Sequence, residues 1–161
     1  MVIRRIKLSK KKIIILRIAI ILLILGWMNL VFGFSAQDST ESSSLSQMIA
    51  SWFSDDIIVQ QKLEPIIRKI AHFSEYGLGG ALFFSLFSTF NIKERKRMLF
   101  AGLLGFTYAV TDEFHQLFVP GRTGKIVDVY IDSLGVITGI LCMKLCIMIY
   151  KQLKKKKQAQ S

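Results

Sequence analysis

The sequence has few residues of the kinds that crosslink small secreted domains or hold metal ions. Among its 161 residues there are only two cysteines and two histidines. Cys142 and Cys146 lie four residues apart in an apolar stretch, which fits neither a disulfide framework nor a zinc site. We expect both to be small, packed core residues. The chain also lacks an HExxH metal motif and a GxSxG serine elbow, so the common zinc-protease and serine-hydrolase chemistries are excluded.

Acidic residues are also scarce, with 11 Asp and Glu against 22 Lys and Arg, and the formal net charge is +11. In a soluble protein this excess would suggest a nucleic-acid partner. Here the basic residues lie at the ends of apolar stretches, and 52% of the chain is hydrophobic. We therefore expect a polytopic membrane protein with no nucleic-acid partner, whose basic blocks reflect its membrane topology.

Four apolar segments approach or exceed the roughly 20 residues that a helix needs to cross a bilayer. They are predicted as helices at about 13–34, 66–90, 99–119 and 127–150. The sequence thus predicts an all-α fold, an integral membrane bundle of four transmembrane helices in one domain over residues 13–150. A soluble second domain has no room in a chain of this length.

Basic blocks give the expected orientation. Residues 1–12 carry two arginines and four lysines. The second and third segments are joined by the basic run Lys93-Glu94-Arg95-Lys96-Arg97, and the chain ends in a lysine-rich tail at 151–161. By the positive-inside rule all three are cytoplasmic, including both chain ends. The first apolar run is longer than that of a signal peptide, and Phe34 is a poor cleavage context, so we expect an uncleaved anchor.

The segment between the first two spans carries acidic residues such as Asp38 and should lie outside. Ser35–Ser46 is rich in serine and is predicted to be a loop. After it, apolar residues recur at helical spacing up to Phe53. We expect this short piece to lie on the outer interface, with Trp52 at headgroup depth.

Ionisable residues interrupt the second, third and fourth apolar segments near their expected outer ends. A charge near the middle of a bilayer costs roughly 2.5–3.5 kcal/mol, so such groups usually face a protein interior or a wet cavity. On the second segment, Lys69, His72 and Tyr76 are three and four residues apart and share a helix face. Gly79 continues that face inward and allows a neighbour to approach closely.

On the third segment, Asp112, His115 and Gln116 are also spaced three and four apart, while Glu113 points about 100° away from Asp112. On the fourth segment, Asp128 and Asp132 lie one turn apart. The same stripe continues deeper as Gly135 and Gly139. These two glycines should allow another helix to pack closely. Three helices thus offer polar faces at one depth, and we expect these faces to form an outward-facing polar pocket.

This set of side chains supports two kinds of chemistry. His72 or His115 can act as a base oriented by Asp112 or Asp132, or the histidines and carboxylates can hold a divalent metal ion. The guanidinium of Arg122 suits a phosphate or carboxylate. We take four residues as catalytic candidates, His72, His115, Asp112 and Asp132. We take six as substrate-binding candidates, Arg122, Glu113, Gln116, Asp128, Tyr76 and Lys69.

The expected partners are membrane lipids, and in particular an anionic lipid headgroup or a lipid-linked cell-wall precursor at the outer leaflet. One alternative is a non-enzymatic membrane protein whose polar cluster is structural or contacts a partner. Another is a small transporter or proton relay, against which the lack of deep charges on the cytoplasmic side argues. The substrate, the metal requirement and the oligomeric state stay open.

At these residues the sequence resembles the VanZ-like family of small bacterial membrane proteins, over roughly residues 13–150. The resemblance rests on Phe34 to Gln37, Lys69 to Gly77, Thr111 to Arg122 and Asp128 to Gly135. Thr111 stands where the family is expected to have Ser. The resemblance implies a four-helix membrane domain, and some members are linked to low-level resistance to glycopeptide antibiotics, teicoplanin more than vancomycin. The family motif makes His72 and the acidic residues candidates without assigning them a reaction.

Overall fold

The computed structural model describes residues 9–37 and 39–159, without the side chains of residues 39–42. Within these ranges the chain forms five helices and no strand, so the predicted all-α fold is confirmed. They are α1 Lys10–Ser35, α2 Ser39–Ser51, α3 Ile57–Ser88, α4 Glu94–Gln116 and α5 Ile126–Ala159. The expected basic cluster at Arg4, Arg5 and Lys7 and the acidic Asp38 lie outside the described residues.

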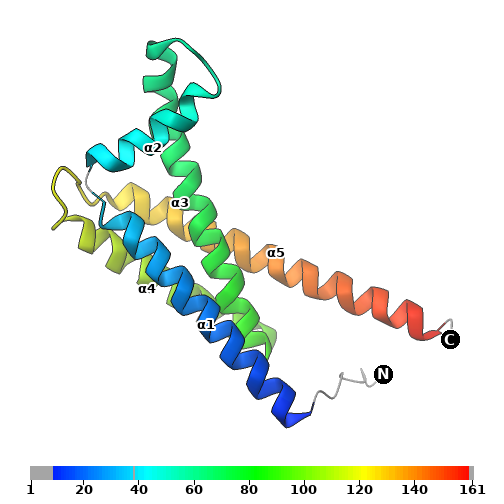
Figure 1. The fold of residues 1–161 in the computed structure, drawn as a ribbon. Helices are drawn as coiled ribbons and strands as arrows, with labels where there is room; N and C mark the ends of the chain where they lie inside the picture. The colour runs from blue at the N-terminus through cyan, green and yellow to red at the C-terminus, as the bar shows by residue number, and fades with distance from the viewer. Residues whose placement is uncertain (1–8, 38, 160–161) are drawn as a thin grey trace.

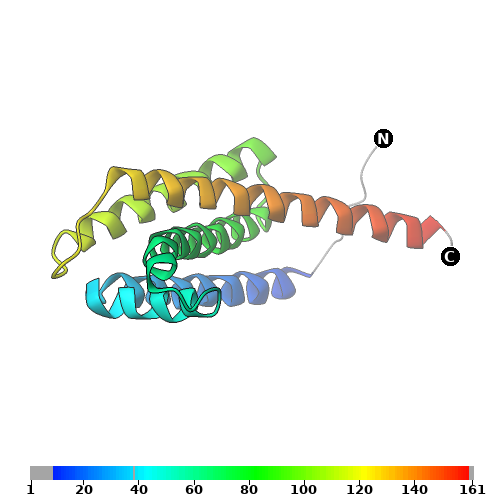
Figure 2. The ribbon, with the colours of Figure 1, turned by 90° about the horizontal axis from the view of Figure 1, so that it is seen from above.

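Helix α3 is the centre of the fold, because it contacts each of the other four helices. Seen from above, it lies between α1 on one side and α5 on the other (Figure 2). Helix α4 packs against both α3 and α5. Helix α2 and the first turns of α3 form a hairpin that projects beyond the rest of the bundle (Figure 1). The start of α1 and the end of α5 lie away from the loop that joins α4 to α5 (Figure 1).

Glycines bring α3 and α5 into close contact. A Cβ atom on Gly135 would collide with the backbone carbonyl of Phe73, and one on Gly139 would collide with the carbonyl of Gly77. From the other side, a Cβ on Gly80 would collide with the carbonyl of Val136. The predicted close packing of Gly135 and Gly139 is confirmed, and it occurs within the chain.

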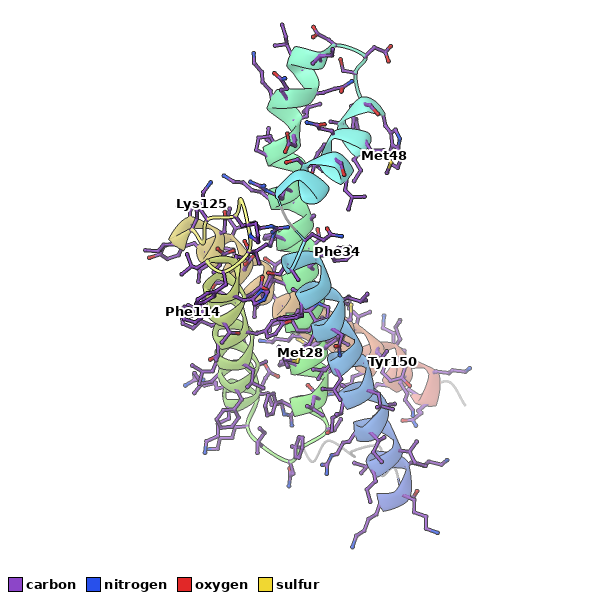
Figure 3. All side chains as sticks on the ribbon, turned by 60° about the vertical axis from the view of Figure 1, so that its left-hand side comes forward. Met28, Phe34, Met48, Phe114, Lys125 and Tyr150 are labelled. Carbon is purple, nitrogen blue, oxygen red and sulfur yellow. The ribbon has the colours of Figure 1, made fainter. Side chains whose placement is uncertain are left out.

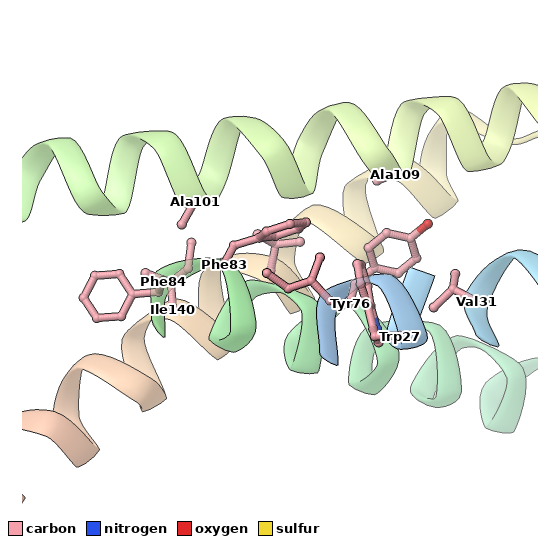
Figure 4. Packing of buried hydrophobic residues seen from close by; sticks show 10 residues of the cluster. Trp27, Val31, Tyr76, Phe83, Phe84, Ala101, Ala109 and Ile140 are labelled. Carbon is pink, nitrogen blue, oxygen red and sulfur yellow. The ribbon is translucent and has the colours of Figure 1, made fainter. Parts of the chain in front are cut away.

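The buried core is a narrow cluster where α1, α3, α4 and α5 meet (Figure 4). The Trp27 ring is at its centre, edge-on to Tyr76 and Phe83 at centroid distances of 6.1 and 5.7 Å. A Cβ on Gly79 would collide with this ring, which confirms the predicted close approach at that glycine. The indole Nε1 donates to the carbonyl of Glu75 at 2.9 Å, so Trp27 joins α1 to α3 by a hydrogen bond as well as by packing.

Most large apolar side chains lie outside this core. Among the described residues, two helices are long and apolar enough to cross a membrane by length and composition, α1 and α5. Only 11% of the most apolar part of α1 and 22% of that of α5 are buried. The core helix of a soluble protein would be mostly buried, whereas these helices turn their apolar residues outward. Helices α3 and α4 do not meet the same criterion, and both carry ionisable residues along their length.

Polar contacts join the helices at the end opposite the α4–α5 loop. Arg17 on α1 donates from Nε to Oγ1 of Thr89 at 3.0 Å and from Nη2 to the Thr89 carbonyl at 3.1 Å. Its guanidinium also lies 4.0 Å from the centre of the Phe90 ring. Lys144 on α5 lies 2.8 Å from a carboxylate oxygen of Glu94. Hydrogen bonding to this ammonium holds the pKa of Glu94 below its ordinary value.

The prediction of a loop over Ser35–Ser46 was wrong, because α2 begins at Ser39. Serine is a weak helix former in isolation, but tertiary packing supplies most helical stability in proteins. Here α2 packs on α3, with Ser46 and Ala50 buried. The helix predicted to begin at 66 also begins earlier, at Ile57, and continues through Pro65.

The prediction that both cysteines are packed core residues was also wrong. Cys142 and Cys146 are exposed on α5. They follow Gly135 and Gly139 at spacings of three and four residues and so share the glycine face of α5. This later part of the helix is nevertheless exposed, so sequence spacing alone could not place them. An exposed apolar face on a candidate membrane span accommodates such residues without burial inside the chain.

Candidate functional site

A pocket of about 390 Å³ opens where α3, the α4–α5 loop and α5 meet. Ligand pockets commonly have volumes of 300–1,000 Å³. In Figure 3, Lys125 of this loop and Phe34 near the end of α1 lie toward the same end of the molecule. Polar and charged side chains from all three elements line the pocket, namely Arg68, Lys69, His72, Gln116, Arg122, Thr123, Lys125, Asp128 and Asp132.

The deepest polar group of the pocket wall is the carboxylate of Asp132. The residue is fully buried, with 0% of its surface exposed. Nδ1 of His72 lies 3.6 Å from Oδ1 of Asp132, slightly longer than a hydrogen bond. Neither oxygen of this carboxylate has a hydrogen-bond partner. Since the glycines of α3 and α5 hold these helices in close contact, they also bring His72 next to Asp132.

Two of the α4 carboxylates are held by other contacts. Nε2 of Gln116 donates to Oδ2 of Asp112 at 3.4 Å, and both residues are buried. Oε2 of Glu113 accepts from the backbone N–H of Lys125 at 2.8 Å. Glu113 therefore fixes the end of the α4–α5 loop, the segment that carries Arg122 to the pocket. This matches the predicted divergence of Glu113 from Asp112.

Arg122 connects the pocket to the end of α1. Its Nε donates to the carbonyl of Gln37 at 2.9 Å and its Nη2 donates to the carbonyl of Phe34 at 3.0 Å. Phe34 lies in the last turn of α1 and Gln37 just after it, where carbonyls have no partner within the helix. The preceding residue, Gly121, has a φ of 72°, a left-handed conformation that glycine adopts without strain. This turn directs the arginine back toward α1 and the pocket.

Four predicted site residues lie outside the pocket lining. His115 faces α1, with its ring 4.5 Å from that of Phe32, and its Nδ1 is buried without a hydrogen-bond partner. Tyr76 is fully buried between Trp27 and Tyr108 in the core, with an unpartnered hydroxyl. Asp112 and Glu113 make the contacts described above. The structure thus brings His72 together with Asp132, and places His115 elsewhere.

The other six predicted residues line the pocket, namely Lys69, His72, Gln116, Arg122, Asp128 and Asp132. Sequence reasoning left out two lining cations, Arg68 and Lys125. Their spacing carried a usable signal. Arg68 lies four residues before His72 on α3 and so falls on the face of a predicted site residue. Lys125 directly precedes α5, within one turn of Asp128.

Charge at the pocket is mainly positive. Its lining includes four permanent cations, from Arg68, Lys69, Arg122 and Lys125, and two acidic residues, Asp128 and Asp132. Basic side chains from two different elements, α3 and the α4–α5 loop, suit an anion that bears several oxygens. Across residues 9–37 and 39–159, no three His, Cys, Asp or Glu side chains are grouped so that they could hold a metal ion. The hypothesis that the site holds a divalent metal ion therefore lacks a group of three such ligands among the described residues.

Comparison with protein-family models finds a match over most of the chain. The family model described as VanZ/LLP1 matches residues 20–148, which include every residue of the pocket lining. No curated protein and no solved structure matches the chain significantly. The match covers most of the chain and agrees with the resemblance identified from the sequence motifs.

Proposed function

The chain belongs to the VanZ/LLP1 family of membrane proteins, and on that premise we propose that it binds an anionic headgroup at its polar pocket. The ligand is an envelope lipid or a lipid-linked cell-wall precursor. The observation that carries this proposal is the set of four basic residues, from α3 and from the α4–α5 loop, that line one pocket. Phosphate oxygens are the groups that such cations bind best in proteins.

The proposal includes a location in the bacterial cytoplasmic membrane with four spans, α1, α3, α4 and α5, and both chain ends inside. Two findings support it. Helices α1 and α5 leave their apolar residues unburied. The basic start of α1, the basic segment Lys93–Arg97 at the start of α4 and the basic end of α5 all lie away from the α4–α5 loop (Figure 1). The pocket then opens toward the outer leaflet, where the headgroups of lipids and precursors lie.

A structural role is favoured for part of the polar cluster. Glu113 holds the loop at Lys125, and Asp112 is bonded to Gln116 on its own helix. For these two acidic residues the non-enzymatic alternative accounts for the observed contacts. It does not account for Asp132, whose buried carboxylate has no hydrogen-bond partner.

Binding of anionic probes to the purified protein tests the proposed function. The full-length protein in nanodiscs should bind farnesyl diphosphate, a prenyl-linked diphosphate, or phosphatidylglycerol more tightly than phosphatidylcholine, with affinity falling as salt is raised. A charge-assisted hydrogen bond is worth about 1.5–3 kcal/mol, so Arg68→Gln should weaken binding about tenfold or more. Lys62→Gln is the matched control, because Lys62 is exposed on α3 outside the pocket.

Equal affinity of Arg68→Gln and Lys62→Gln for both anionic probes would contradict the assignment of the pocket. Lipid and precursor mass spectrometry of cells with and without the protein then distinguishes the two ligand sources. If the ligand is a cell-wall precursor, cells that produce the wild-type protein should differ in teicoplanin susceptibility from cells that produce Arg68→Gln.

A further inference from the structure

Asp132 has surroundings that its structural contacts do not explain. The residue is fully buried, its carboxylate oxygens accept no hydrogen bond, and it lines the pocket beside His72. Burying an unsatisfied carboxylate is costly, and a catalytic role is one of the explanations for such a group in a native structure. The nearest ionisable neighbour is the imidazole of His72, at 3.6 Å from its Nδ1.

This contact decides which nitrogen of His72 is available to a ligand. Since Nδ1 faces Asp132, the other ring nitrogen, Nε2, is left for the pocket that His72 lines. A carboxylate on one nitrogen fixes the tautomer and orientation of an imidazole and stabilises its protonated form. Catalytic hydrogen bonds are often long before substrate binds and shorten in the complex. The geometry is that of a general base with a positioning carboxylate.

The cations around this imidazole favour phosphoryl chemistry. Catalysis of phosphoryl transfer rests on positioning and on neutralising the charge of the oxygens around phosphorus. Two basic residues of α3, Arg68 and Lys69, and two of the α4–α5 loop, Arg122 and Lys125, supply positive charge to the pocket. A carboxylate or a single alkoxide would use only part of this arrangement.

The number of proton-transfer groups restricts the leaving group. Within the described part of the chain, His72 is the one histidine that lines the pocket, because His115 packs on Phe32. If His72 accepts the proton of water, no second imidazole is present to protonate an alcohol as it leaves. A phosphate group departs without needing a proton, so the bond that suits this site is a phosphoanhydride.

Resting on the proposed binding function, we propose that the pocket hydrolyses the terminal phosphoanhydride of a lipid-linked diphosphate. The oxygen of a water molecule bonds to the terminal phosphorus while its proton goes to Nε2 of His72. The bond from that phosphorus to the bridging oxygen breaks, and the bridging oxygen keeps the electron pair. The products are inorganic phosphate and the lipid monophosphate, and His72 returns the proton to solvent. His72 is the catalytic residue and Asp132 is a positioning residue.

The test uses the full-length protein in nanodiscs with farnesyl diphosphate as substrate. The wild-type protein should release inorganic phosphate, and in ¹⁸O-labelled water the label should enter the released phosphate. General base catalysis contributes about 10²–10⁴-fold, so His72→Ala should lower kcat by at least about 100-fold, with partial rescue by added imidazole. Asp132→Asn should lower kcat and leave KM nearly unchanged. Lys62→Gln, on the same helix outside the pocket, is the control and should keep its kcat.

The outcomes separate this inference from the function on which it rests. Tight binding of farnesyl diphosphate without phosphate release by the wild-type protein overturns hydrolysis and leaves the binding function standing. Phosphate release that persists in His72→Ala overturns the role of His72. Failure of the wild-type protein to bind any anionic probe overturns both proposals. The His72→Ala variant is also tested for binding of farnesyl diphosphate and for rescue by imidazole. A misfolded variant would show neither, whereas a folded variant that lacks only the base should show both.

Discussion

Replacing Gly139 by alanine tests whether the close contact of α3 and α5 determines the geometry of the pocket. The added Cβ would collide with the carbonyl oxygen of Gly77 and lie 2.7 Å from its carbonyl carbon. Ordinary contact begins at 3.4 Å, so the helices must separate by at least 0.7 Å at this point. The obstructing atoms are backbone, which cannot rotate away as a flexible side chain would.

The expected magnitude follows from two opposing effects. Overpacking a close contact costs roughly 1–3 kcal/mol, and here the upper part of this range applies because backbone meets backbone. Replacing glycine by alanine inside a helix raises the unfolding free energy by up to about 1 kcal/mol. We therefore expect Gly139→Ala to lose about 2 kcal/mol of unfolding free energy. It should also weaken His72-dependent activity, because separating the helices moves His72 from Asp132.

Gly102→Ala is the matched control for this prediction. It makes the same chemical change on α4, where an added Cβ has no neighbour within 4 Å. Its unfolding free energy should stay unchanged or rise by up to about 1 kcal/mol. The measurement is reversible denaturation of the purified protein in detergent, followed by tryptophan fluorescence. Equal stability of the two variants would refute the claim that backbone contact of α3 with α5 limits the fold.

Three further predictions concern contacts between the helices. Trp27→Phe removes the N–H that donates to the Glu75 carbonyl and should cost at least about 1 kcal/mol of unfolding free energy; an unchanged denaturation midpoint would contradict this. Arg17→Met removes two hydrogen bonds and a ring contact at the end of α3, and should lower the unfolding free energy by about 2 kcal/mol. If the variant resists detergent denaturation as well as the wild-type protein does, these contacts contribute nothing to stability. Lys144→Met should cost less than about 1 kcal/mol, because its pair with Glu94 is partly exposed. Since the pKa of Glu94 is lowered in the folded protein, this stabilisation is present above the unfolded-state pKa, about 4.3, and is lost as pH falls through the folded pKa. Wild-type and variant stabilities should therefore differ at neutral pH and converge in acid, and a constant difference would contradict the pairing.

Spacing within a helix predicted the faces of the site, but not which faces meet. The sequence placed His72 on the face of Lys69 and Asp132 on the face of Asp128, and both faces do line the pocket. Whether Asp112 or Asp132 lies beside His72 was left open. That choice depends on how α4 and α5 rotate against α3, which the glycine contacts determine in three dimensions.

Two other features depended on tertiary contacts that local pattern does not encode. Helix α2 has the composition of a loop, yet it folds against α3 through buried residues such as Ala50. His115 has the spacing of a site residue, yet its ring contacts Phe32 from α1. In both cases the partner lies on another helix, so the pattern along one segment was insufficient.

Arg122 has a consequence for how any ligand is accommodated. Its guanidinium already donates to the main-chain carbonyls that end α1, at Phe34 and Gln37. An anion that draws this side chain inward competes with those carbonyls for the same N–H groups. Occupancy of the pocket and the anchoring of the first helix are therefore thermodynamically linked, so that strengthening one weakens the other by the same free energy.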